Sequence, residues 1–385
     1  MLTYDEYAKL VDYNALAAFR ANALNPEDPR MRSLVDNPDI YFQLRESNNT
    51  AYAELPDIVE DYMAQISKLT GREYHLFNYY GAPDAERVIV AMGSVGGCAQ
   101  EVVNYLNAKG EKVGFLQVHL FRPFSMERLL EKIPATCKCL TVLDRTKEPG
   151  APGEPLYLDV CDALWEGKRT NIEALCGRYG LGSKDTTPAQ MKAVFDNMKG
   201  EKKNHFTVGI NDDVNKTSLP YDDSIDTEPK DVVRAVFFGL GADGTVGANK
   251  NSIKIIAEDA GKYGQGYFVY DSRKSGSMTT SHLRFSDNPI KAAYLISKAD
   301  FVACHQFPFM SKVDILKIAK PGATFLLNAP YGADEVWDHL PIEVQEEIIN
   351  KKLKFYTINA VEVARQTGMG TVSYTHLTLP TTSRV

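Results

Sequence analysis

Cysteine is scarce and scattered in this chain. Six cysteines occur among 385 residues, and only Cys137 and Cys139 lie close together. A C-x-C pair without a second pair lacks the four ligands of a structural zinc site. We therefore expect reduced thiols and no metal ligands in this chain.

Long apolar runs and an excess of positive charge are missing as well. No segment is apolar over enough residues to cross a bilayer, and residues 1–20 have no signal-peptide core. Asp and Glu outnumber Lys and Arg by 50 to 43, which disfavours nucleic acid and anionic membranes as partners. Hydrophobic residues make up 44% of the chain, as in ordinary globular proteins. We therefore expect a cytoplasmic protein with two or three cores and with neither nucleic-acid nor membrane partners.

The first block, residues 1–72, has helical periodicity interrupted by proline. Its clearest helical patterns are YDEYAKLVDYNALAAFRANAL, which stops at NPEDPR, and LPDIVEDYMAQISKLTG, which closes at Gly71. The block carries no motif with chemistry. We expect a helical linker, or the end of a preceding domain.

The second block, residues 73–229, alternates between strand and helix patterns. The run RVIVAMGS is apolar enough for a strand buried on both faces, and the helical pattern CAQEVVNYLNAKG follows it. CLTVLDRT predicts a further strand. Strands that alternate with helices predict right-handed crossovers and a parallel sheet. The acidic, turn-rich stretch NDDVNKTSLPYDDSIDTEPKD then predicts a linker.

The third block begins near residue 230 with the strand pattern VRAVFFGL and a glycine-rich turn. Gly239, Gly241 and Gly244 form G-x-G-x-x-G between this strand and a helical pattern. Glycines let the backbone approach a phosphate, and the free N–H groups of the following helix favour an anion. Asp243 and Thr245 can cap that helix. A turn that caps a helix and binds nothing explains an isolated motif of this kind equally well.

A second strand pattern narrows the choice of ligand. GYFVYDSRKSG reaches its acid, Asp271, later than an NAD-binding fingerprint expects, and Arg273 and Lys274 follow at once. Two cations at an adjacent strand end suit a ligand with a phosphate beyond the diphosphate. NADP and coenzyme A both meet that requirement.

The chain shows no catalytic centre. G-x-S-x-G, Walker, H-E-x-x-H and kinase motifs are missing. No spacing pairs His282, His305 and Cys304 as metal ligands or as a nucleophile and base, so we expect solvated or capping histidines. Asp144 and Arg145 follow a predicted strand, where ligand contact, helix capping and interdomain ion pairs are equally good explanations.

Several stretches together resemble pyruvate:ferredoxin (flavodoxin) oxidoreductases. They include YYGAPDAERVIVAMGSV, LDRTKEPGAPGEPLYLDV, NHFTVGINDDV, GLGADGTVGANKNSIKII and YDSRKSG, and the resemblance covers essentially residues 1–371. It implies an α/β fold with two parallel-sheet domains after the helical linker. Residues 73–229 are similar to a transketolase C-terminal-like domain, and residues 230–371 to a truncated γ-type, Rossmann-like coenzyme A-binding domain. Residues 372–385 match no folded pattern, and we expect a non-native tail there.

The resemblance also implies a function. Pyruvate synthase-type enzymes of this family oxidatively decarboxylate pyruvate to acetyl-CoA and CO2 and pass electrons to ferredoxin or flavodoxin. The family uses thiamine diphosphate, Mg2+ and [4Fe–4S] clusters on domains expected outside this chain, and the full enzyme is expected to be a homodimer. This chain would then be an inactive internal fragment that contributes coenzyme A binding. Another 2-oxoacid:ferredoxin oxidoreductase and an NADP-dependent dehydrogenase domain remain alternatives.

The resemblance assigns coenzyme A contacts residue by residue. The family's coenzyme A loop matches Gly241, Ala242, Asp243, Gly244 and Thr245. Arg273 stands where the family usually has a lysine that contacts coenzyme A. Arginine keeps the charge but changes the donor geometry. No catalytic residue is predicted.

Overall fold

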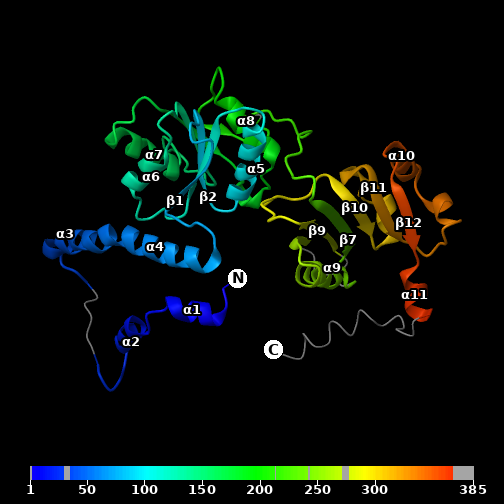
Figure 1. Cartoon of the computed structure of the whole chain (residues 1–385), viewed down its shortest axis with the longest axis horizontal. Helices are drawn as coiled ribbons and strands as arrows, with labels where there is room; N and C mark the ends of the chain where they lie inside the picture. The colour runs from blue at the N-terminus through cyan, green and yellow to red at the C-terminus, as the bar shows by residue number, and fades with distance from the viewer. Residues whose placement is uncertain (1, 30–34, 213, 242, 271–276, 367–385) are drawn as a thin grey trace. The chain divides into compact units, whose positions relative to one another are not determined.

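The computed structural model describes residues 2–29, 35–212, 214–241, 243–270 and 277–366. The chain divides into two compact units, Met1–Ile225 and Asp226–Val385, and each holds one six-stranded sheet with helices (Figure 1). The predicted α/β class is therefore confirmed. The assignment of sequence blocks to named domain types stays a prediction.

The first unit begins with four helices, in the block where helices were predicted. Thr3 caps the first helix through a reciprocal capping box with Glu6, and Gly71 ends the fourth in a left-handed conformation with φ 68°. Val59 and Met63 of the fourth helix pack against the core of the sheet. No helix among the described residues is both long and apolar enough to span a membrane. The four helices are α1 (Tyr4–Leu10), α2 (Tyr13–Ala21), α3 (Pro38–Ser47) and α4 (Asn49–Thr70).

The sheet of the first unit has the order β1-β3-β2-β4-β5-β6. Five strands are parallel, as predicted, but the edge strand β1 runs antiparallel to β3. In Figure 1 the helices α6 and α7 lie over one face of the sheet, and α5 and α8 over the other. The strands are β1 (Phe77–Gly81), β2 (Arg87–Met92), β3 (Val113–Val118), β4 (Cys139–Asp144), β5 (Glu173–Arg178) and β6 (Phe206–Thr207); the helices are α5 (Val95–Asn107), α6 (Met126–Lys132), α7 (Pro155–Glu166) and α8 (Pro188–Asn197).

The sheet of the second unit has the order β12-β11-β10-β7-β9-β8. The first four strands of this order are parallel, whereas β9 runs antiparallel to both β7 and β8. The predicted parallel arrangement is confirmed for four strands, and the edge formed by β9 and β8 is antiparallel. The strands are β7 (Val233–Leu240), β8 (Tyr263–Tyr270), β9 (Met278–Ser286), β10 (Ala299–Cys304), β11 (Ala319–Asn328) and β12 (Lys354–Ile358); the helices are α9 (Thr245–Lys254), α10 (Ile342–Asn350) and α11 (Ala360–Gln366).

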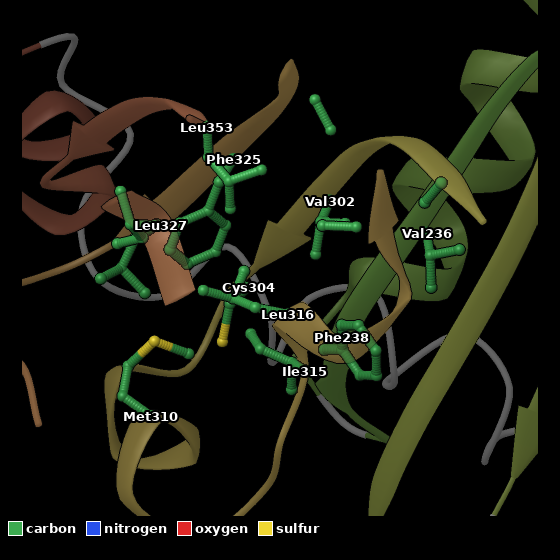
Figure 2. Close-up of a cluster of buried hydrophobic side chains, with 14 of the residues drawn as sticks. Val236, Phe238, Val302, Cys304, Met310, Ile315, Leu316, Phe325, Leu327 and Leu353 are labelled. Carbon is green, nitrogen blue, oxygen red and sulfur yellow. The ribbon is translucent and has the colours of Figure 1, made fainter. Parts of the chain in front are cut away.

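The core of the second unit lies against the parallel strands. Figure 2 shows side chains from three neighbouring strands. Met310, Ile315 and Leu316, from the connection between β10 and β11, pack against them. Burying this apolar surface fixes the strands whose ends form the site described below. The strand residues in the view are Val236 and Phe238 of β7, Val302 and Cys304 of β10, and Phe325 and Leu327 of β11.

Buried charge ties the start of the second unit to its sheet. The Arg234 guanidinium donates to both carboxylate oxygens of Asp226, each at 2.9 Å. Glu228 accepts from Arg284 Nε at 2.9 Å, and Arg284 is only 2% exposed. Because these ion pairs hold the segment before β7, the second compact unit begins at Asp226.

Candidate functional site

Four parallel strands of the second unit end at one edge of its sheet. The segments that follow them begin at Gly241 after β7, His305 after β10, Ala329 after β11 and Asn359 after β12. Ligands of open α/β sheets bind in the crevice at the carboxyl ends of parallel strands. This edge is therefore the candidate site.

The glycine turn after β7 depends on the small size of its glycines. A Cβ on Gly239 would collide with the side chain of Thr245. Gly244 has φ 78°, a left-handed conformation that favours glycine, and it forms the N-cap of α9. Gly241 N donates to Ser277 O at 3.0 Å, which fastens the turn to the start of β9.

Asp243 shapes this turn with both carboxylate oxygens. Its Oδ1 accepts from Thr245 N at 3.0 Å, while its Oδ2 accepts from Leu240 N at 2.7 Å and from Gln306 Nε2 at 3.1 Å. The negative charge at the start of α9 is favourable because the helix dipole is positive there. These contacts give Asp243 a role in holding the loop together.

Thr245 and His305 form a polar pair next to the turn. Thr245 Oγ1 lies 2.7 Å from His305 Nδ1, and Thr245 is only 2% exposed. Burial lowers the pKa of His305, although the nearby Asp243 carboxylate raises it. His305 N donates to Phe238 O at 2.9 Å and His305 O accepts from Asn328 Nδ2 at 3.1 Å. The backbone of His305 is thus fixed between two strands, and its imidazole is neutral at neutral pH.

A cavity of about 690 Å3 opens at the same edge. The ends of β10, β11 and β12 and one side of α11 form its walls. Among the described residues that line it, none is Lys or Arg. The polar lining residues are Asp243, His305, Gln306, Asn328 and Asn359; the apolar ones are Phe307, Pro308, Leu326, Ala329, Pro330, Ile358, Ala360, Val361 and Ala364.

Three buried polar side chains of α9 and β9 lack a hydrogen-bond partner in the described part of the chain. They are Asn249 Nδ2, Thr279 Oγ1 and Ser281 Oγ, on residues that are 3%, 1% and 0% exposed. Thr279 pairs with Gly239 across the β7–β9 ladder, so it lies beside the glycine turn. Buried polar groups are normally satisfied by protein, water or ligand. The base of the turn is therefore suited to a polar occupant.

The predicted loop residues Gly241, Asp243, Gly244 and Thr245 lie together at this edge. Ala242 and Arg273 are outside the described residues, as is Lys274. β8 ends at Tyr270, which pairs with Thr279, so the chain leaves β8 at the edge where β7 ends.

Two details of the sequence interpretation are wrong. β9 lies between β7 and β8, so the end of β8 is two strand spacings, about 10 Å, from β7 rather than adjacent to it. His282 is buried on β9, and its Nδ1 accepts from Ile296 N at 3.2 Å, so it is not a solvated histidine. Sequence reasoning also left His305 and Gln306 without a role in the site. The available signal was their position directly after the apolar run ADFVAC, which forms β10 (Ala299–Cys304).

Two family models match this chain. Residues 234–379 match "Pyruvate ferredoxin/flavodoxin oxidoreductase", and residues 85–191 match "Pyruvate:ferredoxin oxidoreductase core domain II". The pyruvate:ferredoxin oxidoreductase of Moorella thermoacetica is 55% identical over 96% of this chain and 32% of its own length. The pyruvate-flavodoxin oxidoreductase of Trichormus variabilis is 54% identical over 96% of this chain and 31% of its own length.

A solved pyruvate oxidoreductase subunit from Thermotoga maritima is a much weaker match. It is 16% identical over 36% of this chain and 67% of its own, with a TM-score of 0.27. The fold is that of an α/β protein with a candidate ligand site at one edge of its second sheet. The sequence matches identify the family: the chain belongs to the pyruvate ferredoxin/flavodoxin oxidoreductase family. It spans about a third of the length of the relatives that it matches.

Proposed function

We propose that this chain contributes coenzyme A binding to an enzyme that oxidatively decarboxylates pyruvate to acetyl-CoA and CO2. Electrons would pass to ferredoxin or flavodoxin, as the names of its relatives indicate. Thiamine diphosphate, Mg2+ and [4Fe–4S] clusters would be held by other parts of the enzyme, which we infer to be a cytoplasmic homodimer. This chain would bind coenzyme A, and we assign it no catalytic residue.

The observation that carries coenzyme A binding is the glycine turn at the carboxyl end of β7. The turn leads directly into α9: the N–H of its first residue, Thr245, donates to Asp243, and the next N–H groups of the first turn have no partners within the helix. A phosphate can approach them closely because Gly241 and Gly244 have no side chains. The N–H groups of Leu240 and Thr245 donate to the Asp243 carboxylate, so part of its negative charge is compensated within the turn. We assign the contacts to Gly241, Ala242, Gly244 and Thr245, with Asp243 holding the loop.

The remaining charge of coenzyme A is its 3′-phosphate, which we assign to Arg273. Isothermal titration of the 385-residue chain with coenzyme A, dephospho-coenzyme A and NADPH tests both assignments. Loss of one charge-assisted contact of about 1.5–3 kcal/mol should make dephospho-coenzyme A bind at least tenfold more weakly. In Arg273→Gln that difference should disappear.

The matched control is Arg128→Gln, which removes a partly exposed arginine from the other unit and should leave both affinities unchanged. Equal binding of the two coenzyme forms by the unaltered chain would refute the role of Arg273. Tighter binding of NADPH than of coenzyme A would instead favour the dehydrogenase alternative.

A further inference from the structure

We propose that the cavity at the ends of β10, β11 and β12 binds an uncharged, hydrogen-bonding part of the ligand whose phosphates lie at the glycine turn. This inference rests on the proposed function. In a coenzyme A molecule two parts have the required chemistry: the amides of the pantetheine arm and the adenine base. Both present a hydrogen-bond donor near an acceptor.

The charge of the cavity wall argues for a neutral occupant. Its described lining residues include the Asp243 carboxylate and no Lys or Arg. A phosphate inside would meet a negative charge without a cation to compensate it, and burying an unpaired charge is strongly unfavourable. The two parts of this edge therefore differ: the helix terminus favours an anion, and the cavity favours a neutral group.

The polar residues of the cavity differ in how much hydrogen-bonding capacity they retain. Asn328 Nδ2 donates to His305 O at 3.1 Å, and its Oδ1 accepts from Ala360 N at 3.0 Å. Asn359 Oδ1 caps α11 by accepting from Glu362 N at 3.1 Å. These two asparagines are engaged in joining the strand ends.

His305 and Gln306 keep one group each for a ligand. Gln306 must donate from Nε2 to Asp243, because a carboxylate only accepts, so Gln306 Oε1 is left as an acceptor. Thr245 Oγ1 lies 2.7 Å from His305 Nδ1; we assign the hydroxyl as the donor, which places the proton of the neutral imidazole on Nε2. Two consecutive residues thus offer one acceptor and one donor. That pair matches an amide or the edge of an adenine.

The size and remaining walls of the cavity fit the same ligand. Small-molecule sites commonly have volumes of about 300–1,000 Å3, are mostly apolar and carry a few polar groups. This cavity has about 690 Å3, with Phe307, Leu326 and Ile358 among its apolar residues. An amide-bearing chain or an aromatic base can pack on such walls while it bonds to His305 and Gln306.

The test uses the whole chain and two neutral probes, pantetheine and adenosine. We expect at least one probe to bind with a Kd of about 10 mM or tighter and to shift the NMR signals of the Gln306 side-chain amide and the Ala329 and Ala360 amides. Arg273→Gln should weaken coenzyme A but leave the neutral probe unaffected. Binding of pantetheine alone assigns the cavity to the arm, binding of adenosine alone assigns it to the base, and binding of both supports the shared chemistry.

The second measurement uses a variant in which a large side chain fills the cavity. Ala364 of α11 lines the cavity, whereas its neighbour Val363 does not and is exposed. Ala364→Trp should weaken coenzyme A binding about tenfold or more and abolish binding of the neutral probe, while Val363→Trp should change neither by more than about twofold. Far-UV circular dichroism and thermal melting of both variants establish that they fold.

The outcomes separate this inference from the proposed function. If coenzyme A binds the unaltered chain and Ala364→Trp equally well, or if neither neutral probe binds, the cavity assignment is overturned and coenzyme A binding stands. If coenzyme A does not bind the unaltered chain, both proposals fall. A misfolded Ala364→Trp leaves the decision to the probe titrations, which need no variant of the cavity.

Discussion

Polar residues that follow the strands have different roles in the two sheets of this protein. In the first unit, Asp144 at the end of β4 accepts from Leu156 N and Tyr157 N, each at 3.1 Å, and so caps α7. Arg145 Nε next to it donates to Gly180 O at 2.7 Å. In the second unit, His305 and Gln306 hold the turn after β7 and still border a cavity of about 690 Å3.

The difference shows that a strand-end position alone does not make a site. Both units have α/β sheets with polar residues after the strands. In the first unit those residues satisfy the backbone of the next element, which is a structural role. In the second, we propose that backbone groups of the turn and side chains of the cavity bind a ligand.

The largest effect is expected from Arg284 in the second unit. Arg284→Leu leaves the buried Glu228 carboxylate without its closest partner and should lower the free energy of unfolding of this unit by about 3–5 kcal/mol. The chain has two tryptophans, Trp165 in the first unit and Trp337 in the second. Urea unfolding followed by the fluorescence of Trp337, in a Trp165→Phe background, measures the loss.

The matched control is Lys262→Met, which breaks an exposed ion pair with Asp287 in the same unit and should cost less than about 1 kcal/mol. A loss below about 1 kcal/mol in Arg284→Leu would mean that the segment before β7 is held by something other than this pair.

The second effect is a pH dependence in the first unit. Burial raises the pKa of the Asp144 carboxyl to about 6, even though two backbone N–H groups lower it. The native state therefore takes up a proton between pH 7 and 4 before the unfolded chain does, so this group makes the unit more stable as pH falls through that window, by about 1–3 kcal/mol. Asp144→Asn should remove this part of the dependence. Urea titrations read by pulsed hydrogen exchange in peptides of β2 and β4 give the comparison.

Asp212 of the same unit should change the stability of that unit with pH in the opposite direction, and it serves as a control. The backbone donor Asn215 N and the Thr217 hydroxyl lower the pKa of its carboxyl to about 2. Its contribution is present above pH about 4 and is lost as pH falls towards 2. An identical pH profile for Asp144→Asn and the unaltered chain between pH 7 and 4 would contradict the role of Asp144.

The third prediction compares two glycines of the second unit. Gly244 has φ 78°, so Gly244→Ala should destabilise the unit by about 1 kcal/mol and weaken coenzyme A binding. Gly247 lies in α9, and an added Cβ meets nothing within 4 Å, so Gly247→Ala should stabilise the unit by up to about 1 kcal/mol. Thermal melts of both variants measure the two stability changes. Equal shifts would show that the turn is not constrained.

The smallest effect is expected at Thr245. Thr245→Val removes the hydroxyl that bonds His305 Nδ1 and should cost about 0.5 kcal/mol, whereas Thr245→Ser keeps the hydroxyl. The 15N chemical shifts of the imidazole report its tautomer directly. We expect Nε2 to be protonated in the unaltered chain and in Thr245→Ser, and a mixture of tautomers in Thr245→Val. A mixture in the unaltered chain would contradict the donor assigned to His305.

Much of the fold could be predicted from local patterns. The apolar run RVIVAMGS predicted β2, because a strand covered on both faces needs no alternation of polar residues. Four consecutive residues of β2 are buried. The run VRAVFFGL and the glycines after it gave β7, the turn and the start of α9. The family also followed from the sequence, since its motifs recur in order along the chain.

The pairing of strands could not be predicted in this way. β9 inserts antiparallel between β7 and β8, and β1 pairs antiparallel with β3. Hydrogen bonds between strands join residues far apart in the chain, and the period of a strand does not encode its neighbour. The inference that the cations after β8 lie at a strand adjacent to β7 failed for this reason.

The α/β class, the family and the glycine turn follow from the order of the amino acids, because these features depend on local periodicity, backbone freedom and ordered motifs. Which polar groups meet depends on how the chain packs. The tertiary structure placed His305 and Gln306 beside Asp243 and Thr245, some sixty positions earlier in the chain. It also created the cavity from the ends of three strands and α11. Contacts of this kind arise from packing and sheet order, and no local pattern specifies them.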